Sequence, residues 1–150
     1  MKNAKIRFIQ EPDIDGLIEL CKLHADYEKS EYSSENKKQM LYPHLFSNNP
    51  SVYCLVVEHN DKLIGFASYS KEFSTWNAAF YIHMDCLFMI EEARGFGLGE
   101  KLVDKIKEEG AKLQCDHIQW QTPDFNLRAI KFYNRIGGQS KVKQRYTLKI

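Results

Sequence analysis

The stretch "EEARGFGLGEKLV", residues 91–103, links a long apolar run to an apolar stripe with helical spacing, so it decides how the fold is arranged. Gly95, Gly97 and Gly99 stand at alternate positions after Arg94, where the predicted helix begins. The first turn of a helix carries N–H groups without partners and the positive end of the helix dipole, and both favour an anion. Glycine lets a ligand approach the backbone closely and permits a positive φ. The stretch therefore predicts either a phosphate-binding loop or a tight turn without a ligand.

Two better-known phosphate loops do not fit this stretch. A Walker loop needs G-x-x-x-x-G-K-[ST], but Gly99 is followed by Glu100 and Lys101. The dinucleotide fingerprint is G-x-G-x-x-G near the first strand of a βαβ unit, whereas this chain has G-x-G-x-G late in the sequence. Spacing and context therefore exclude both motifs.

Hydrophobic periods of two and of about 3.6 residues divide the chain into strands and helices without a linker. We predict strands over 4–10, 51–59, 62–73, 77–90, 116–122 and 142–150, and helices over 11–28, 34–46, 97–113 and 126–137. Asn60 and Asp61 predict a short hairpin turn. Pro43 is expected to break or end part of the second helix. The order predicts an α/β fold with a mixed sheet and flanking helices, in one domain of residues 1–150.

Composition excludes several classes of protein. The 21 basic residues nearly balance the 20 acidic ones, and no basic block favours nucleic acid. The longest relevant apolar run, residues 52–57, is too short to span a membrane, and the N-terminal residues lack the apolar core of a signal peptide. The cysteines lie about thirty residues apart without a C-x-x-C pair, and the histidines are scattered. We therefore expect reduced thiols in the cytoplasm and no metal site.

Longer motifs resemble one known family. The string "RGFGLG", residues 94–99, resembles the R/Q-x-x-G-x-G/A motif of the GNAT superfamily of N-acetyltransferases. The string "NLRAIKFYNRIGG", residues 126–138, is similar to the N-x-x-A-x-x-F-Y-x-x-x-G-[FA] segment of that superfamily. The resemblance covers residues from about 4 to 149. Within the superfamily, "YE" at 27–28 and "FSTW" at 73–76 make the chain most similar to the diamine (spermidine/spermine) acetyltransferase group.

The resemblance implies a central mixed, mostly antiparallel sheet, flanked by helices and splayed where acetyl-CoA binds without a metal. Its pyrophosphate would rest on the backbone of the glycine-rich loop, and its pantetheine arm would pair like a strand with residues 87–89. A backbone N–H there would stabilise the oxyanion. The cofactor-binding residues implied are Leu87, Phe88, Met89, Arg94, Gly95, Phe96, Gly97, Leu98, Gly99, Glu100 and Asn126. Asn126 is also expected to cap its helix.

Two catalytic residues follow from the resemblance. Tyr133 would give a proton to the departing thiolate, a mildly uphill transfer between a tyrosine of pKa about 10 and a thiol of about 8.5. The alternative is a tyrosine that only fills the groove between helix and sheet. A primary amine has a pKa of about 10.4, so it must lose a proton before it attacks. Asp85 would accept that proton directly or through water, unless it simply faces solvent. His83 shares a strand face with Asp85.

The leading functional hypothesis is acetyl transfer to a primary amine of a small molecule by direct attack on the thioester. That molecule would be a polyamine, a diamine, a lysine-like amino acid or an aminoglycoside. Its implied binding residues are Tyr27, Glu28, Trp76, His83 and Asp85. The alternatives are a protein lysine or N-terminal acetyltransferase and a non-catalytic acyl-CoA sensor, although a sensor needs neither Tyr133 nor Asp85. The resemblance also suggests a homodimer.

Overall fold

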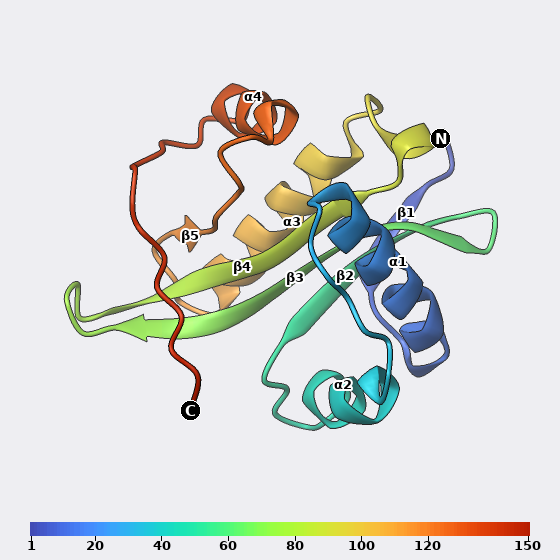
Figure 1. The fold of residues 1–150 in the computed structure, drawn as a ribbon, viewed down its shortest axis with the longest axis horizontal. Helices are drawn as coiled ribbons and strands as arrows, with labels where there is room; N and C mark the ends of the chain where they lie inside the picture. Colours follow the sequence, from blue (N-terminus) through green and yellow to red (C-terminus); the bar gives the residue numbers. More distant parts are fainter.

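A five-stranded sheet runs through the molecule in the order β1-β2-β3-β4-β5 (Figure 1). The structure is a computed structural model that describes residues 1–150. Its strands are β1 (Lys5–Phe8), β2 (Tyr53–His59), β3 (Lys62–Ser74), β4 (Ala79–Met89) and β5 (Ile118–Gln119). The first four strands pair antiparallel, and β5 pairs parallel to β4. The predicted mixed, mostly antiparallel sheet is confirmed.

Helices cover both faces of this sheet, with α1 in front and α3 behind it in the view of Figure 1. The helical elements are η1 (Glu11–Asp13), α1 (Ile14–Tyr27), α2 (Lys37–Leu45), η2 (Glu91–Ala93), α3 (Leu98–Lys112) and α4 (Leu127–Arg135). Asn60 and Asp61 join β2 to β3 with φ of 51° and 58°. Two successive positive φ values are those of a type I′ turn, so the predicted hairpin is confirmed.

The core lies in two layers, one on each face of the sheet. Leu98, Leu102 and Ile106 of α3 belong to one buried cluster, and Leu17 and Leu20 of α1 belong to the other. Alternate residues of β2 enter the two clusters in turn: Leu55 and Val57 face α3, and Cys54 and Val56 face α1. A strand buried on both faces needs apolar residues at successive positions, which explains its continuous apolar sequence.

The second helix passes through Pro43, contrary to expectation. Pro43 lies inside α2, and the helix ends only at Leu45. A proline removes the hydrogen bond to the carbonyl four residues earlier, here that of Gln39. Because this loss falls within the last turn, where few further bonds depend on it, the helix does not break at Pro43.

The predicted strand over 142–150 is wrong. The segment pairs with no strand, and Val142, Tyr146 and Leu148 are 100%, 90% and 92% exposed. In Figure 1 it runs from α4 to the C-terminus outside the sheet. The alternation of apolar and polar residues is a strand pattern, but a strand also needs an edge that offers hydrogen bonds along its length. The neighbouring edge strand, β5, is only two residues long.

The sheet opens along one side of β4. Strand β5 pairs with β4 only at Ile82 and His83, so residues 84–89 have no strand on that side. A β-bulge lies at the start of this open edge, because Tyr69 pairs with Met84 and Ser68 with Cys86, which leaves Asp85 as the extra residue. No helix of the structure is both long and apolar enough to cross a membrane.

Candidate active site

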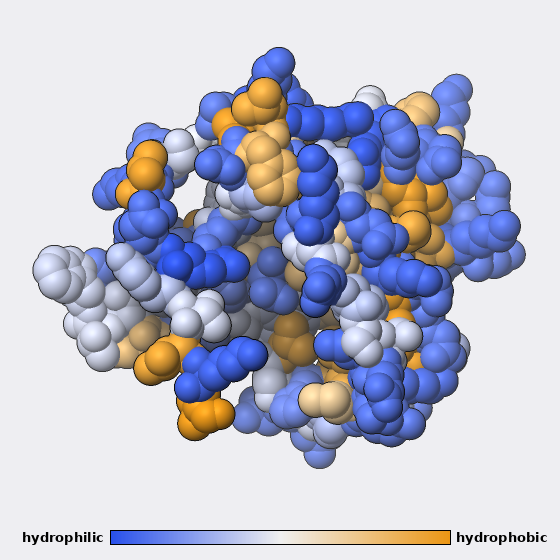
Figure 2. All heavy atoms as spheres, in the orientation of Figure 1, coloured by the Kyte–Doolittle hydropathy of each residue, from blue (hydrophilic) through white to orange (hydrophobic).

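A cleft of about 1480 Å³ lies along the open edge of β4. Its walls come from the C-terminal half of α1, from β4, from the glycine-rich loop that begins α3, and from α4 with the segment before it. The hollow is visible near the middle of the face drawn in Figure 2. Pockets for one small ligand usually measure ~300–1,000 Å³, so this cleft has room for a large cofactor together with an acceptor.

The glycine-rich loop presents bare backbone to this cleft. Gly95 and Gly97 have φ of 87° and 75°, and a Cβ added to either would meet no atom of the chain within 4 Å. The first hydrogen bond of α3 runs from the N–H of Lys101 to the carbonyl of Gly97, at 3.1 Å. The preceding N–H groups of the first turn therefore have no partner within the helix, and the positive end of its dipole faces the cleft. This cradle fits an anion such as a phosphate.

Arg94 is held between the loop and the end of β4. Its Nε donates a hydrogen bond to the carbonyl of Met89 at 2.9 Å. The guanidinium lies over the ring of Tyr27 at 4.4 Å and near that of Phe88 at 5.6 Å. These contacts hold Arg94 on the wall of the cleft and leave terminal N–H groups for an anionic ligand.

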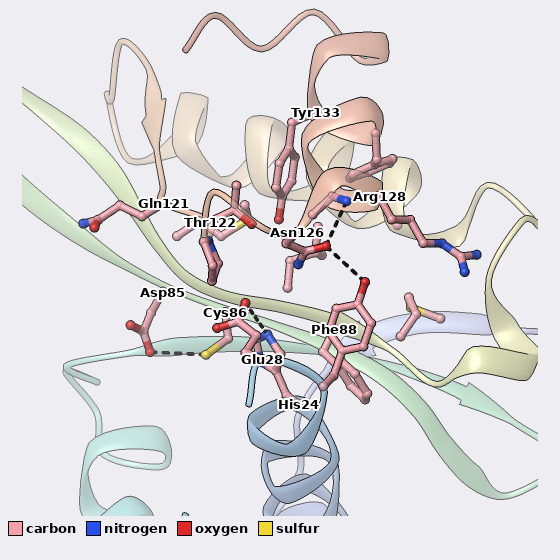
Figure 3. A pocket seen from close by; sticks show the side chains of 18 of the residues that line it. His24, Glu28, Asp85, Cys86, Phe88, Gln121, Thr122, Asn126, Arg128 and Tyr133 are labelled. Atoms are coloured by element: carbon pink, nitrogen blue, oxygen red, sulfur yellow. Dashed lines mark hydrogen bonds and ion pairs between the residues drawn. The ribbon is translucent and has the colours of Figure 1, made fainter. Parts of the chain in front are cut away.

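Asn126 connects the two helices on either side of the cleft. Its Oδ1 accepts a hydrogen bond from the N–H of Ala129 at 3.2 Å, which confirms the predicted helix cap. The same oxygen accepts a hydrogen bond from the hydroxyl of Tyr27 at 3.1 Å. Figure 3 shows both bonds, the second of which ties the end of α1 to the start of α4.

Tyr133 points its hydroxyl from α4 into the cleft (Figure 3). Its ring packs against Trp120 with 5.1 Å between centroids. Burial, followed by the nearby charge of Glu28, raises the pKa of Tyr133 to about 12. Tyr133 therefore stays protonated throughout the physiological range. It is also a weaker acid than free tyrosine, so equilibrium transfer to a thiolate of pKa about 8.5 is uphill by roughly 5 kcal/mol.

Carboxylates line the part of the cleft next to the β4 bulge. Asp85 is exposed, and its Oδ2 accepts a hydrogen bond from the Cys86 thiol at 3.5 Å. Burial, followed by the charge of Asp85, raises the pKa of that thiol. Glu28 is the C-cap residue of α1, and its Oε1 lies 3.3 Å from Nε2 of His24. His83 is half-buried and also lines the cleft.

The fold brings most of the predicted site residues to this one cleft. Those that line it are Tyr27, Glu28, His83, Asp85, Leu87, Phe88, Met89, Arg94, Gly95, Gly97, Leu98, Gly99, Glu100, Asn126 and Tyr133. Phe96 is 58% exposed and lies outside the lining. Trp76, predicted to bind substrate, is 95% exposed in the turn between β3 and β4 and does not line the cleft. That hairpin extends beyond the helices in Figure 1.

Sequence reasoning missed several residues of the cleft, including His24, Cys86, Gln121, Thr122, Arg128 and the segment 142–145. His24 had a detectable signal, because residues four apart on a helix share a face and Glu28 was already a candidate. The others depend on the bulge and on the path of the chain around α4. No group of three or more His, Cys, Asp or Glu side chains is arranged to hold a metal ion.

Comparisons with known proteins agree with this geometry. Residues 17–138 match the model of the acetyltransferase (GNAT) family. Thialysine N-epsilon-acetyltransferases from Bos taurus and Mus musculus are 27% and 24% identical to the chain over 147 residues, covering 93% of it and 86% of each relative. A solved aminoglycoside acetyltransferase from an uncultured soil metagenomic sample, meta-AAC0020, superimposes with a TM-score of 0.82 at 19% identity, covering 99% of this chain and 98% of that one.

Proposed function

Because the chain belongs to the acetyltransferase (GNAT) family, we propose that it moves the acetyl group of acetyl-CoA to a primary amine of a small molecule, with residues 1–150 as one catalytic domain. The observation that carries this proposal is a single cleft with two chemically different parts. One part has the free N–H groups of the α3 start and Arg94, which suit a phosphate, and the other has Glu28 and Asp85, which suit an ammonium group.

The same cleft supports the proposed binding of acetyl-CoA. The backbone from Gly95 to Glu100 and the side chain of Arg94 would hold the pyrophosphate. The unpaired side of β4 at residues 87–89 offers strand-like hydrogen bonds to the two amides of the pantetheine arm. Asn126, at the start of α4, would contact the cofactor from the opposite wall. Acetyl-CoA supplies a thioester that a neutral amine can attack.

Tyr133 is the proposed general acid for the leaving sulfur. Its hydroxyl faces the cleft and remains protonated, as an acid must before the reaction. Because the pKa of Tyr133 is raised, complete transfer of its proton to the sulfur is unfavourable until the C–S bond weakens. The proton transfer therefore accompanies cleavage of that bond. A backbone N–H within residues 87–89 is the proposed donor to the oxyanion.

Asp85 is the proposed acceptor of the amine proton, acting through water. Because Asp85 is the extra residue of the bulge, its carboxylate lies outside the core, in the solvent-exposed part of the cleft. An exposed carboxylate stays charged at neutral pH, so it also attracts the ammonium form of the substrate. His83 lies two residues earlier on the same strand and would line the same path.

The proposed substrates are lysine-like amino acids and diamines, with polyamines and aminoglycosides as further members of the class. Similar proteins include acetyltransferases of thialysine, L-ornithine and D-amino acids, all small molecules that carry an amine. A cleft with two carboxylates suits a substrate with two amines, because their negative charge attracts both ammonium groups.

We also propose that the protein is a homodimer. Apolar side chains of the segment 142–150 stand out at the lower left of Figure 2, where Figure 1 places the C-terminus. Trp76 and Phe73 are similarly exposed on the β3–β4 hairpin. A second copy would cover apolar surface that is otherwise left in water.

A panel of amines incubated with acetyl-CoA tests the proposed function. Release of free thiol is expected with thialysine, ornithine and short diamines, and not with lysine-containing peptides. Turnover confined to peptides would instead indicate a protein acetyltransferase. Calorimetric binding of acetyl-CoA without thiol release from any amine would indicate a sensor.

A further inference from the structure

His24 of α1 and Glu28, the C-cap residue of that helix, form a pair that lines the cleft. His24 precedes Glu28 by one helical turn, and His24 Nε2 lies 3.3 Å from Glu28 Oε1. Their side chains are only 16% and 29% exposed, so the pair sits deeper than the exposed Asp85. An imidazole beside a carboxylate orients it and stabilises its charge, most strongly where water is partly excluded.

The imidazole of His24 is itself held in place by the strand that forms the cleft floor. It stacks on the ring of Phe88 with 5.1 Å between centroids and an interplanar angle of 24°. It also meets Phe66 edge-on at 6.1 Å. With its ring fixed on two sides, His24 can orient the carboxylate of Glu28, and Figure 3 shows the contact between the two side chains.

Among the carboxylates of the cleft, Glu28 also has the strongest electrostatic effect on Tyr133. Its charge is the leading electrostatic contribution to the raised pKa of that tyrosine, whereas Asp85 acts on Cys86 and Cys21. The other titratable or charged groups that line the cleft are Cys21, His24, Tyr27, Tyr32 and Lys37 on the side of α1 and α2, His83, Asp85 and Cys86 from β4, Arg94 and Glu100 from the loop and the start of α3, and Asp124, Arg128, Lys131, Tyr133, Arg135, Lys143 and Arg145 from α4 and the segments around it. Figure 3 places Glu28 between Asp85 and Tyr133.

We propose that Glu28 is the catalytic residue that first takes the proton from the acceptor amine, and that His24 is the positioning residue that holds its carboxylate beside Phe88. Asp85 then receives the proton from Glu28 through water, at the outer end of the same path. This inference rests on the proposed acetyl transfer, and it assigns the inner carboxylate a chemical step in addition to substrate binding.

The proton path is balanced. One proton of the acceptor ammonium passes to the Glu28 carboxylate, and the freed nitrogen lone pair attacks the thioester carbonyl carbon. The C–N bond forms and the C–S bond breaks, while Tyr133 gives its hydroxyl proton to the leaving sulfur. The resulting tyrosinate takes a second proton from the nitrogen, and the last proton stays on the amide. Glu28 returns its proton to water by way of Asp85, so the products are the amide, the free thiol and one proton.

Glu28→Gln tests the catalytic step, with Asp26→Asn as a matched control because Asp26 lies on the same helix end but outside the cleft. With thialysine as acceptor, Glu28→Gln should lower kcat/KM about 100-fold or more at pH 7, as loss of a general base does. The defect should shrink as the pH approaches the amine pKa of about 10.4. Trifluoroethylamine, which is mostly uncharged at neutral pH, should show a smaller defect. Asp26→Asn should behave as wild type, and Asp85→Asn should lose less than Glu28→Gln.

His24→Phe tests the positioning role, because it keeps a ring on Phe88 and removes the nitrogen near Glu28. Loss of the imidazole contact that orients the Glu28 carboxylate should lower kcat about 10-fold or more, with the KM for acetyl-CoA unchanged. His24→Gln restores an N–H donor and should recover part of the loss. A packing role alone predicts the reverse order, with His24→Phe the more active variant.

Calorimetry supplies a readout that is independent of turnover. Thialysine should bind about 10-fold more weakly to Glu28→Gln than to Asp26→Asn, while acetyl-CoA binds both equally, since a charged hydrogen bond is lost only in the first variant. If wild-type protein acetylates amines and Glu28→Gln keeps its pH profile, only this inference is overturned. If wild-type protein acetylates no amine, the proposed function is overturned with it.

Discussion

Replacing Gly97 with alanine separates ligand binding from backbone strain. The backbone of Gly97 is left-handed at φ 75°, an added Cβ meets no atom of the chain within 4 Å, and the residue lines the cleft. Gly137 provides the control, since its φ is 89°, its added Cβ also meets nothing within 4 Å, and it lies outside the cleft. Both variants place alanine in a conformation disfavoured by ~1–2 kcal/mol.

The two variants should therefore lose similar stability and differ in affinity. For a chain of this size 1 kcal/mol lowers Tm by ~2–4 °C, so each variant should melt about 2–8 °C below wild type. In Gly97→Ala the methyl group holds the pyrophosphate away from the N–H groups of the α3 start. Losing two charge-assisted hydrogen bonds of at least ~1.5 kcal/mol each weakens binding by about 100-fold or more.

Calorimetric titration of each variant with acetyl-CoA, well below its melting temperature, measures this difference. We expect wild-type affinity for Gly137→Ala and greatly reduced affinity for Gly97→Ala. Wild-type affinity in both folded variants would show that the loop does not hold the pyrophosphate. Equal losses in both would show that strain, and not the space occupied by the methyl group, controls binding.

Three further predictions concern other parts of the molecule. Tyr133→Phe should lower kcat about 100-fold or more with little change in the KM for acetyl-CoA. Because burial raises the pKa of Tyr133 to about 12, the pH profile of the wild type measured below that value should show no loss of activity from ionisation of this tyrosine. Hydrogen bonds from Arg7 lower the pKa of Asp13, so the stability that this carboxylate contributes is present above its unfolded pKa and disappears as the pH falls through the folded one. Asp13→Asn should therefore unfold at lower urea than wild type at pH 7, with the difference closing in acid. Removal of residues 141–150 should convert a dimer to a monomer in sedimentation velocity, and an unchanged mass would refute the proposed homodimer surface.

Local signals were sufficient for most elements of the fold. The helical stripe from Leu98 to Ile106 and the apolar runs of β2 and β3 predicted elements that the structure contains. These patterns succeed because each element buries its apolar side against the same sheet. The segment 142–150 has an equally clear alternation and still forms no strand, because no edge of the sheet within the chain pairs with it.

The sequence by itself determined the family motifs, the glycines at the start of α3 and the helix cap of Asn126, because each depends on residues close together in the chain. Only the tertiary structure determined which side chains lie near the carboxylates of Asp85 and Glu28. The bulge at Asp85 arises from pairing with β3 and turns that side chain outward, and no pattern within β4 announces it. Glu28 comes into the neighbourhood of Tyr133 only because α1 and α4 meet across the open edge of the sheet, joined by the hydrogen bond from Tyr27 to Asn126. Contacts between residues about a hundred positions apart depend on how whole elements pack, which local spacing does not encode.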